Sequence, residues 1–91
     1  MINFPCDIKR LIAIMLSLAI FVGCTTAFNK GVEHAKLGQD EEAIADFTEA
    51  IRLDPTDARS YQGRALCHER LENTLQADKD FAKAKELGYW P

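Results

Sequence analysis

Cysteine is scarce in this sequence of 91 residues and occurs three times, at Cys6, Cys24 and Cys67. Small domains that depend on disulfides usually contain an even number of regularly spaced cysteines. If the chain is cut before Cys24, as argued below, Cys6 is lost and Cys24 becomes a modified terminus. We therefore expect no intramolecular disulfide in the mature protein.

The sequence also lacks an excess of positive charge. Eleven Lys and Arg face 14 Asp and Glu, which gives a net charge of −3 at pH 7, and residues 24–91 alone carry nine basic and 13 acidic residues, a net charge of −4. Proteins that bind nucleic acid present a basic surface to the phosphates. We therefore expect no nucleic-acid partner.

A third absence is an apolar run long enough for a permanent membrane span. The longest run, residues 11–22, holds 12 residues and would be about 18 Å long as a helix, whereas the hydrocarbon core of a bilayer is about 30 Å thick. It follows Lys9 and Arg10 and ends before a small residue, Gly23, which is the order of an export signal. Residues 1–23 are therefore predicted to be a signal peptide that precedes a mature domain.

Residues 21–24, Phe-Val-Gly-Cys, resemble a lipobox, the signal of bacterial lipoproteins. The resemblance implies that Cys24 receives a diacylglyceryl group and, after cleavage, becomes the N-terminus, while Gly23 lets the peptidase approach. Two or more acyl chains, of the palmitate kind, anchor a protein stably. We expect anchoring at the periplasmic face of a bacterial membrane, the outer one where two exist, because Thr25 rather than Asp follows the cysteine. Secretion without an anchor and an uncleaved short anchor are the alternatives.

An internal repeat occupies the rest of the chain. Shifting residues 34–53 by 34 positions gives seven identical pairs in 20 positions. A period of 34 residues with small and aromatic residues at fixed places is typical of tetratricopeptide repeats, each of which is a helix, a turn and a helix. The identical pairs are His34 and His68, Leu37 and Leu71, Ala43 and Ala77, Asp46 and Asp80, Phe47 and Phe81, Ala50 and Ala84, and Leu53 and Leu87.

Residues 43–55 resemble the second helix and exit turn of the tetratricopeptide repeat family. Gly31 and Ala65 match the family's small residue where the two helices of a hairpin approach, and Ala43 and Ala77 match its partner. The resemblance implies an all-α fold with two helix-turn-helix hairpins, about four antiparallel helices. It departs from the family in three places. The usual aromatic residue is Tyr61 in the second copy but Ala27 in the first, the usual second tyrosine is replaced by His34 and His68, and the second copy has Tyr89 where the first has Pro55. The hairpins would be repeat 1, about 24–57, and repeat 2, about 58–91.

The spacing of apolar residues agrees with this fold. Ala43, Phe47 and Ala50 recur on one face of a helix that Pro55 ends. The outer positions Ile44 and Ile51 become Asp78 and Lys85 in the second copy, and a polar outer face is typical of a terminal repeat. The predicted helices are 26–37, 41–53, 58–71 and 74–87, with Asp40, Thr56 or Asp57, and Asn73 as N-caps and Gly88 as a stop signal.

In tetratricopeptide proteins the first helices of the hairpins line a groove that holds a peptide or a helix of a partner. The resemblance implies a membrane-anchored adaptor or scaffold of the cell envelope with an unidentified protein partner. A structural homo-oligomer, in which Phe28, Val32 and Leu66 complete a small core or pack against a second copy, is the alternative. Carried over by position, the groove residues are Phe28, Val32, Ala35, Lys36, Arg59, Gln62, Leu66, Glu69 and Arg70.

Nothing in the sequence points to catalysis. His34 and His68 occupy equivalent positions, but two imidazoles without convergent thiolates or carboxylates make a poor metal site. Cys67 and His68 are neighbours in a helix and point about 100° apart, so they do not form a catalytic pair. We expect a protein that is not an enzyme and has no metal or cofactor.

Overall fold

The computed structural model describes residues 22–88, and these contain four helices and no strand. The described part of the first helix spans residues 22–36, and α2 (Asp40–Leu53), α3 (Ala58–Arg70) and α4 (Thr74–Glu86) follow. The predicted all-α fold of two helical hairpins is confirmed. Most of the predicted signal peptide, Cys6 and residues 89–91 lie outside the described residues.

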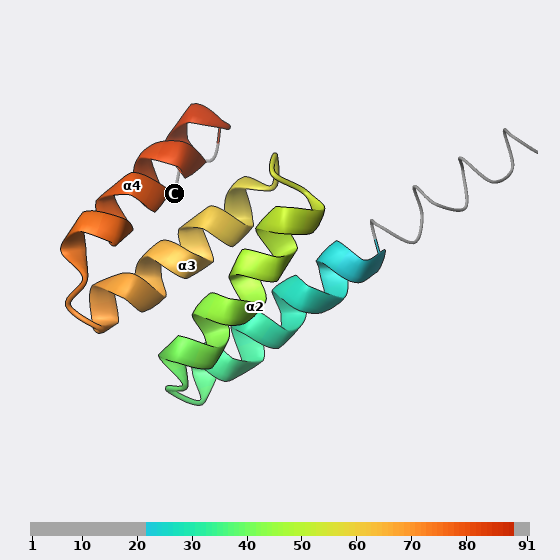
Figure 1. Ribbon diagram of the computed structural model, residues 1–91, viewed down its shortest axis with the longest axis horizontal. Coiled ribbons are helices and arrows are strands. Elements are labelled where there is room, and N and C mark those ends of the chain that lie inside the picture. The colour runs from blue at the N-terminus through green and yellow to red at the C-terminus, as the bar shows by residue number, and fades with distance from the viewer. Residues whose placement is uncertain (1–21, 89–91) are drawn as a thin grey trace, which may run out of the picture.

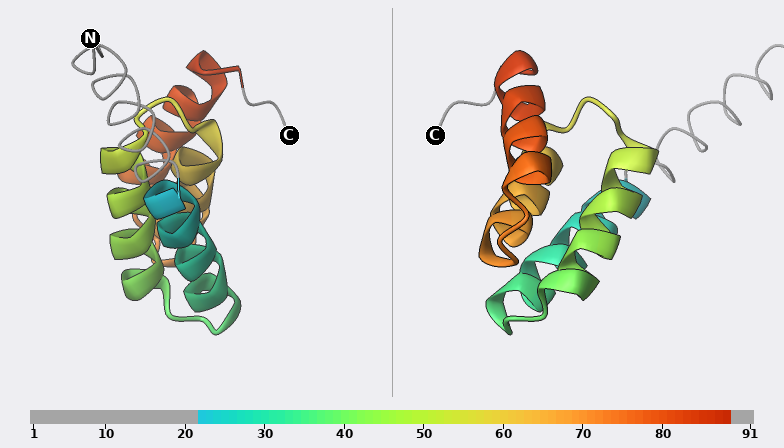
Figure 2. Two further views of the ribbon diagram at one scale, coloured as in Figure 1. Left: turned by 90° about the vertical axis from the view of Figure 1, so that its right-hand side faces the viewer. Right: turned by 60° about the vertical axis from the view of Figure 1, so that its left-hand side comes forward.

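Two hairpins stack in chain order, as Figures 1 and 2 show. The first helix pairs with α2, α3 pairs with α4, and α3 contacts both α2 and α4. The helix ends predicted from the sequence are within one residue of the observed ones, except at the first helix, which includes residues 22–25. Those residues are helical because Cys24 and Ala27 bury their side chains against Ala50 of α2.

The helix starts differ in detail from the predicted caps. Asp40 is the first residue of α2 rather than its cap, Gln39 precedes it without a side-chain cap bond, and the Asp40 carboxylate pairs instead with Arg70 of α3. Asp57 caps α3 as predicted, accepting a hydrogen bond from the backbone N–H of Arg59 at 3.1 Å. Asn73 is at the predicted cap position of α4 but makes no side-chain cap bond.

The two hairpin turns use the same backbone conformation with different residues. Gly38 has a φ of 75° and Glu72, which is 34 residues further on, has a φ of 61°. The left-handed region costs a residue with a Cβ about 1 kcal/mol or more, and glycine does not pay that cost. The second turn therefore keeps the shape of the first at a local energetic cost.

Phe47 of α2 determines how closely the helices on either side approach. Its ring lies against Gly31 of the first helix and Gly63 of α3, where an added Cβ would be 2.8 and 2.6 Å from ring carbons. Both glycines are thus required by one aromatic ring. The close approach predicted at Gly31 is confirmed, and the side chain that an added Cβ would meet there is the ring of Phe47.

Polar contacts join helices both within each hairpin and between the two hairpins. Arg64 of α3 donates to both carboxylate oxygens of Asp80 in α4, at 2.8 and 2.7 Å, and to the hydroxyl of Thr48 in α2 at 3.2 Å. In the first hairpin His34 Nδ1 lies 2.5 Å from Asp46 Oδ2. Asp46 and Asp80, which are equivalent positions of the two repeats, therefore bind different partners.

The outer face of α4 is polar, as expected of a terminal repeat. Ile44 of α2 packs on the buried cluster that includes Cys67 of α3, whereas Asp78 and Lys85, the equivalents of Ile44 and Ile51, are exposed. The second hairpin thus presents charge where the first presents apolar surface to its neighbour.

Candidate protein-interaction groove

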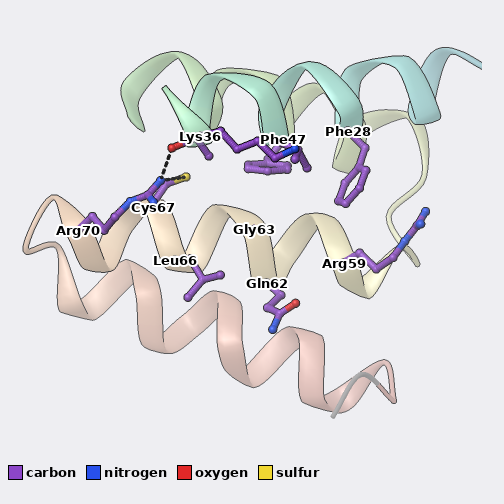
Figure 3. Close-up of a pocket in the computed structure, with 11 residues that line it drawn as sticks. Phe28, Lys36, Phe47, Arg59, Gln62, Gly63, Leu66, Cys67 and Arg70 are labelled. Atoms are coloured by element: carbon purple, nitrogen blue, oxygen red, sulfur yellow. Dashed lines mark hydrogen bonds between the residues drawn. The ribbon is translucent and has the colours of Figure 1, made fainter. Parts of the chain in front are cut away.

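A groove of about 350 Å³ runs between the first helix and α3. We call it the interhelical groove. Figure 3 shows its walls, with Phe28 and Arg59 at one end and Lys36 and Arg70 at the other. Its lining residues are Phe28, Val32, Ala35, Lys36, Phe47, Arg59, Gln62, Gly63, Leu66, Cys67 and Arg70.

Helical periodicity explains how the walls form. Phe28, Val32 and Ala35 are four and three residues apart on the first helix, so they lie on one face. On α3 the lining positions fall three, four, seven, eight and eleven residues after Arg59, which is again one face of a helix. An apolar face of the first helix therefore opposes a mixed face of α3, and no other helix of the described residues lies between them.

The floor comes from buried residues of α2 and α3. Phe47 is 2% exposed and Cys67 is fully buried, and the rings of Phe47 and Phe28 have centroids 5.7 Å apart. Burial raises the pKa of the Cys67 thiol, although nearby Arg70 opposes the shift. A thiol held protonated at neutral pH is a poor nucleophile, so Cys67 serves as packing in the floor.

An arginine closes the end of the groove near Phe28. The Arg59 guanidinium lies 4.7 Å from the centre of the Phe28 ring, a distance that suits a cation–π contact. Its Nε and Nη2 donate to the Asp57 carboxylate at 3.1 and 3.2 Å. Asp57 thus holds Arg59 over the ring.

A second arginine closes the opposite end. Arg70 Nη2 donates to the carbonyl of Ala35 on the first helix at 3.2 Å and to the carboxylate of Asp40 on α2. The next residue after Ala35 is Lys36, whose ammonium lies 3.6 Å from the carboxylate of Glu33. This end of the groove therefore carries two cations.

The lining of the groove is apolar and cationic, and it contains no carboxylate. The chain as a whole is acidic, with a net charge of −3. The carboxylates of Asp57 and Asp40 lie behind the arginines, with side chains only 9% and 12% exposed. The two arginines thus face the groove with their carboxylate partners buried behind them, whereas Glu33, the partner of Lys36, is exposed.

The structure brings together all the predicted groove residues except Glu69. Glu69 is exposed and is not part of the lining. It lies about 80° around the helix from Arg59, just beyond Gln62 at the edge of the lining face. Sequence reasoning missed Phe47, Gly63 and Cys67, which form the floor. A glycine inside a predicted helix, as at Gly63, was the available signal for a close approach.

Cys24, the predicted lipid attachment site, lies in the core of the first hairpin. It is 5% exposed, and its thiol lies 3.4 Å from the carbonyl of Ala50 and 4.0 Å from Asp57 Oδ2. Burial, and then the negative charges of Asp57 and Asp54, raise its pKa. In this conformation the thiol is shielded from modification.

The remaining candidates do not converge on a site. Among residues 22–88 no three His, Cys, Asp or Glu side chains come together as a metal would require. His34 lies against Asp46 rather than near His68. No helix in the same range combines the length and hydropathy that crossing a bilayer would need.

Comparison with known proteins identifies a family and several relatives that this chain resembles. Residues 26–57 match the model of the family described as tetratricopeptide repeat. The mitochondrial import receptor subunit TOM70 of Rattus norvegicus is 41% identical over 66 residues, which are 67% of this chain and 11% of that protein. The Hsp70-Hsp90 organizing protein of Triticum aestivum is 43% identical over 58 residues, 64% of this chain and 10% of that protein.

A longer match covers 77 residues of the human tetratricopeptide repeat protein 34, at 35% identity, 80% of this chain and 14% of that protein. The chain thus spans about a tenth of the length of these curated relatives. Among solved structures, a mutant of MamA superposes with a TM-score of 0.71 over 98% of this chain and 78% of that one, at 24% identity. That likeness establishes the fold alone.

Proposed function

We propose that this chain is a membrane-tethered adaptor that binds a segment of a protein partner in the interhelical groove. The match to the tetratricopeptide repeat model and the similar relatives support this proposal. The fold is one that serves protein–protein interaction. The observation that carries the proposal is the groove itself, in which an apolar face of the first helix opposes a face of α3 that holds Leu66 between two arginines, across an open space of about 350 Å³.

The exposure of the groove side chains supports binding. Leu66 is 46% exposed on the wall of α3, and Phe28 and Val32 are partly buried on the opposite wall. Burying such side chains under a partner would stabilise a complex, at about 25 cal/mol for each Å² of apolar surface removed from water. A helix laid into an apolar groove is a common mode of recognition.

The tether is proposed from the order of residues 1–24. An anchor at Cys24 would hold the Phe28 end of the groove near the bilayer, because Cys24 precedes Phe28 by about one helical turn. The buried thiol adds a condition, since acylation requires access to it. We propose that modification precedes folding of the first hairpin, at the periplasmic face of a bacterial membrane, the outer one where two exist.

Crosslinking in cells tests the proposed binding. Full-length protein would be compared with Leu66→Glu in the groove and with Leu75→Glu as a control, since Leu75 is 66% exposed outside the groove. We expect a distinct envelope protein to be recovered with the parent chain and with Leu75→Glu, and to be lost with Leu66→Glu. Recovery that is equal for both variants would rule out the groove as the binding site.

Self-association is the second candidate function. Leu37 and Leu75 are 72% and 66% exposed and lie outside the groove, and three or more repeats are usually needed for independent stability. Sedimentation at micromolar concentration of the chain made without lipid distinguishes self-association from binding of another protein. A stable dimer that Leu37→Glu or Leu75→Glu dissociates would favour self-association, and a monomer would exclude it.

A further inference from the structure

We infer that the segment which occupies the interhelical groove is an acidic amphipathic helix of the partner, with an apolar face and carboxylates about three turns apart. This inference rests on the proposed function and adds the chemistry of the partner. It follows from the position of the cations, from the absence of carboxylates in the lining and from the shape of the walls.

The cations mark the two ends of the groove. Arg59 and Arg70 are eleven residues apart on α3, which corresponds to about 16 Å along the helix and to nearly the same face. Lys36 stands beside the Arg70 end, since Arg70 donates to the carbonyl of the residue before it, Ala35. Two positively charged ends are therefore separated by the apolar stretch that contains Leu66.

The side chains at both ends retain exposed surface for a partner. Arg59, Arg70 and Lys36 are 58%, 50% and 69% exposed. Asp57 and Asp40 bind the guanidinium groups from behind and thus fix their positions. A guanidinium has five N–H donors, and the bonds to Asp57 use Nε and Nη2 of Arg59. A positioned arginine loses less conformational entropy when it binds a carboxylate.

Charge complementarity selects the sign of the partner. An acidic segment meets three cations among the lining residues. The carboxylates paired with Arg59 and Arg70 are buried, and the exposed carboxylate beside Lys36, that of Glu33, lies outside the lining, so attraction exceeds repulsion. A basic segment would meet like charges at both ends, and like charges placed together at an interface weaken binding.

The walls select a helix. Phe28, Val32 and Ala35 form a straight apolar stripe on one helix, and Gln62, Gly63 and Leu66 lie on the facing wall. Apolar side chains at positions three, four and seven residues apart on a third helix would fit against the apolar stripe on one side and Leu66 on the other. A third helix there would also cover the floor residue Phe47.

Three synthetic helical peptides of equal length and identical apolar face test the inference. One carries Glu in its first and last turns, one carries Gln there and one carries Lys. Binding to the full chain in detergent is measured by fluorescence anisotropy, and the contacted residues by NMR shifts of the labelled protein. We expect the acidic peptide to bind at least about tenfold more tightly than the neutral one, with shifts at Val32, Gln62 and Leu66, and to weaken as salt rises.

Two variants locate the effect. Lys36→Glu should weaken the acidic peptide about tenfold more than it weakens the neutral peptide, because it reverses one charge at the groove's end. Lys30→Glu is the control, since Lys30 is exposed on the same helix and outside the lining. It should change neither affinity.

The outcomes separate the two proposals. Equal groove binding by the acidic and neutral peptides, or tighter binding by the basic one, would overturn the acidic partner and leave the binding groove standing. Acidic binding that perturbs only residues outside the groove would also overturn it. An absence of groove shifts with every peptide would overturn both the acidic partner and the proposed function.

Discussion

At the scale of single residues, one aromatic ring connects three helices. Phe47 is buried in α2 and touches the backbone side of Gly31 and Gly63, and it also forms the floor of the interhelical groove. Few other large side chains are fully buried in the described residues, where the core consists mainly of alanines and cysteines. The packing at Phe47 therefore controls both stability and groove shape.

Gly63→Ala should lower the free energy of unfolding by about 1–2 kcal/mol, because the added methyl group would overlap the ring and overpacking costs about 1–3 kcal/mol, partly offset by the better helix propensity of alanine. Urea denaturation followed by circular dichroism measures this. Phe47→Leu in the same chain should recover part of the loss. Additive effects of the two substitutions would show that the ring is not the cause.

The two described cysteines are predicted to react slowly with thiol reagents. Burial raises the pKa of both Cys24 and Cys67, so at pH 8 a smaller fraction is the reactive thiolate than in the unfolded chain, and raising the pH should speed the reaction. Labelling of unlipidated Cys6→Ser protein with a maleimide, with and without urea, measures it. Rapid labelling of Cys24 in the folded chain would contradict its packing against Ala50.

At the scale of elements, the two hairpin turns provide a matched pair. Gly38 and Glu72 occupy equivalent positions with positive φ, and only the second carries a Cβ there. The first turn is thus unstrained and the second is strained, although the helices on either side follow the same period. The sequence repeat does not reveal this difference, because it depends on the backbone conformation.

Glu72→Gly should raise the free energy of unfolding by about 0.5–1 kcal/mol, since relief of the left-handed strain exceeds the extra entropy of glycine in the unfolded chain. Gly38→Ala should lower it by about 1 kcal/mol for the converse reason. Thermal and urea unfolding report both. Glu72→Ala is the control and should leave stability nearly unchanged; a gain equal to that of glycine would assign the effect to the lost carboxylate.

At the scale of the whole molecule, the two hairpins form a short array with one polar end and one open groove. Small folded chains bury a limited fraction of their surface and are marginally stable, so an outside contact over the groove would add a large part of the total. The binding site and the stability of the molecule are therefore coupled.

A groove-binding peptide should raise the melting temperature of the chain. At a concentration of one hundred times its dissociation constant, a ligand that binds only the folded state adds about 2.7 kcal/mol. Calorimetry of the full chain in detergent, titrated with the acidic peptide, measures the shift. The Leu66→Glu variant should show no shift at the same concentration, and an equal shift there would mean that the peptide binds elsewhere.

The sequence by itself determined the elements and their order. The 34-residue period, the apolar spacing around Phe47 and the break at Pro55 are local patterns, and a helix is built from local hydrogen bonds. The resemblance to the tetratricopeptide repeat family placed the groove residues on the first helices of both hairpins. Binding at those residues and anchoring at Cys24 stay predictions.

Only the tertiary structure decided how those faces are used. The sequence predicts Asp40 as a helix cap, but its carboxylate binds Arg70, and it predicts Cys24 as a lipid attachment site, but its side chain packs on Ala50. Both contacts depend on a residue 26 to 30 positions away in the chain. The burial of Asp57 and Asp40 behind the arginines, which leaves the groove cationic in an acidic chain, likewise arises only when the hairpins stack. Contacts between distant residues carry no periodic signal, so the sequence pattern could not supply them.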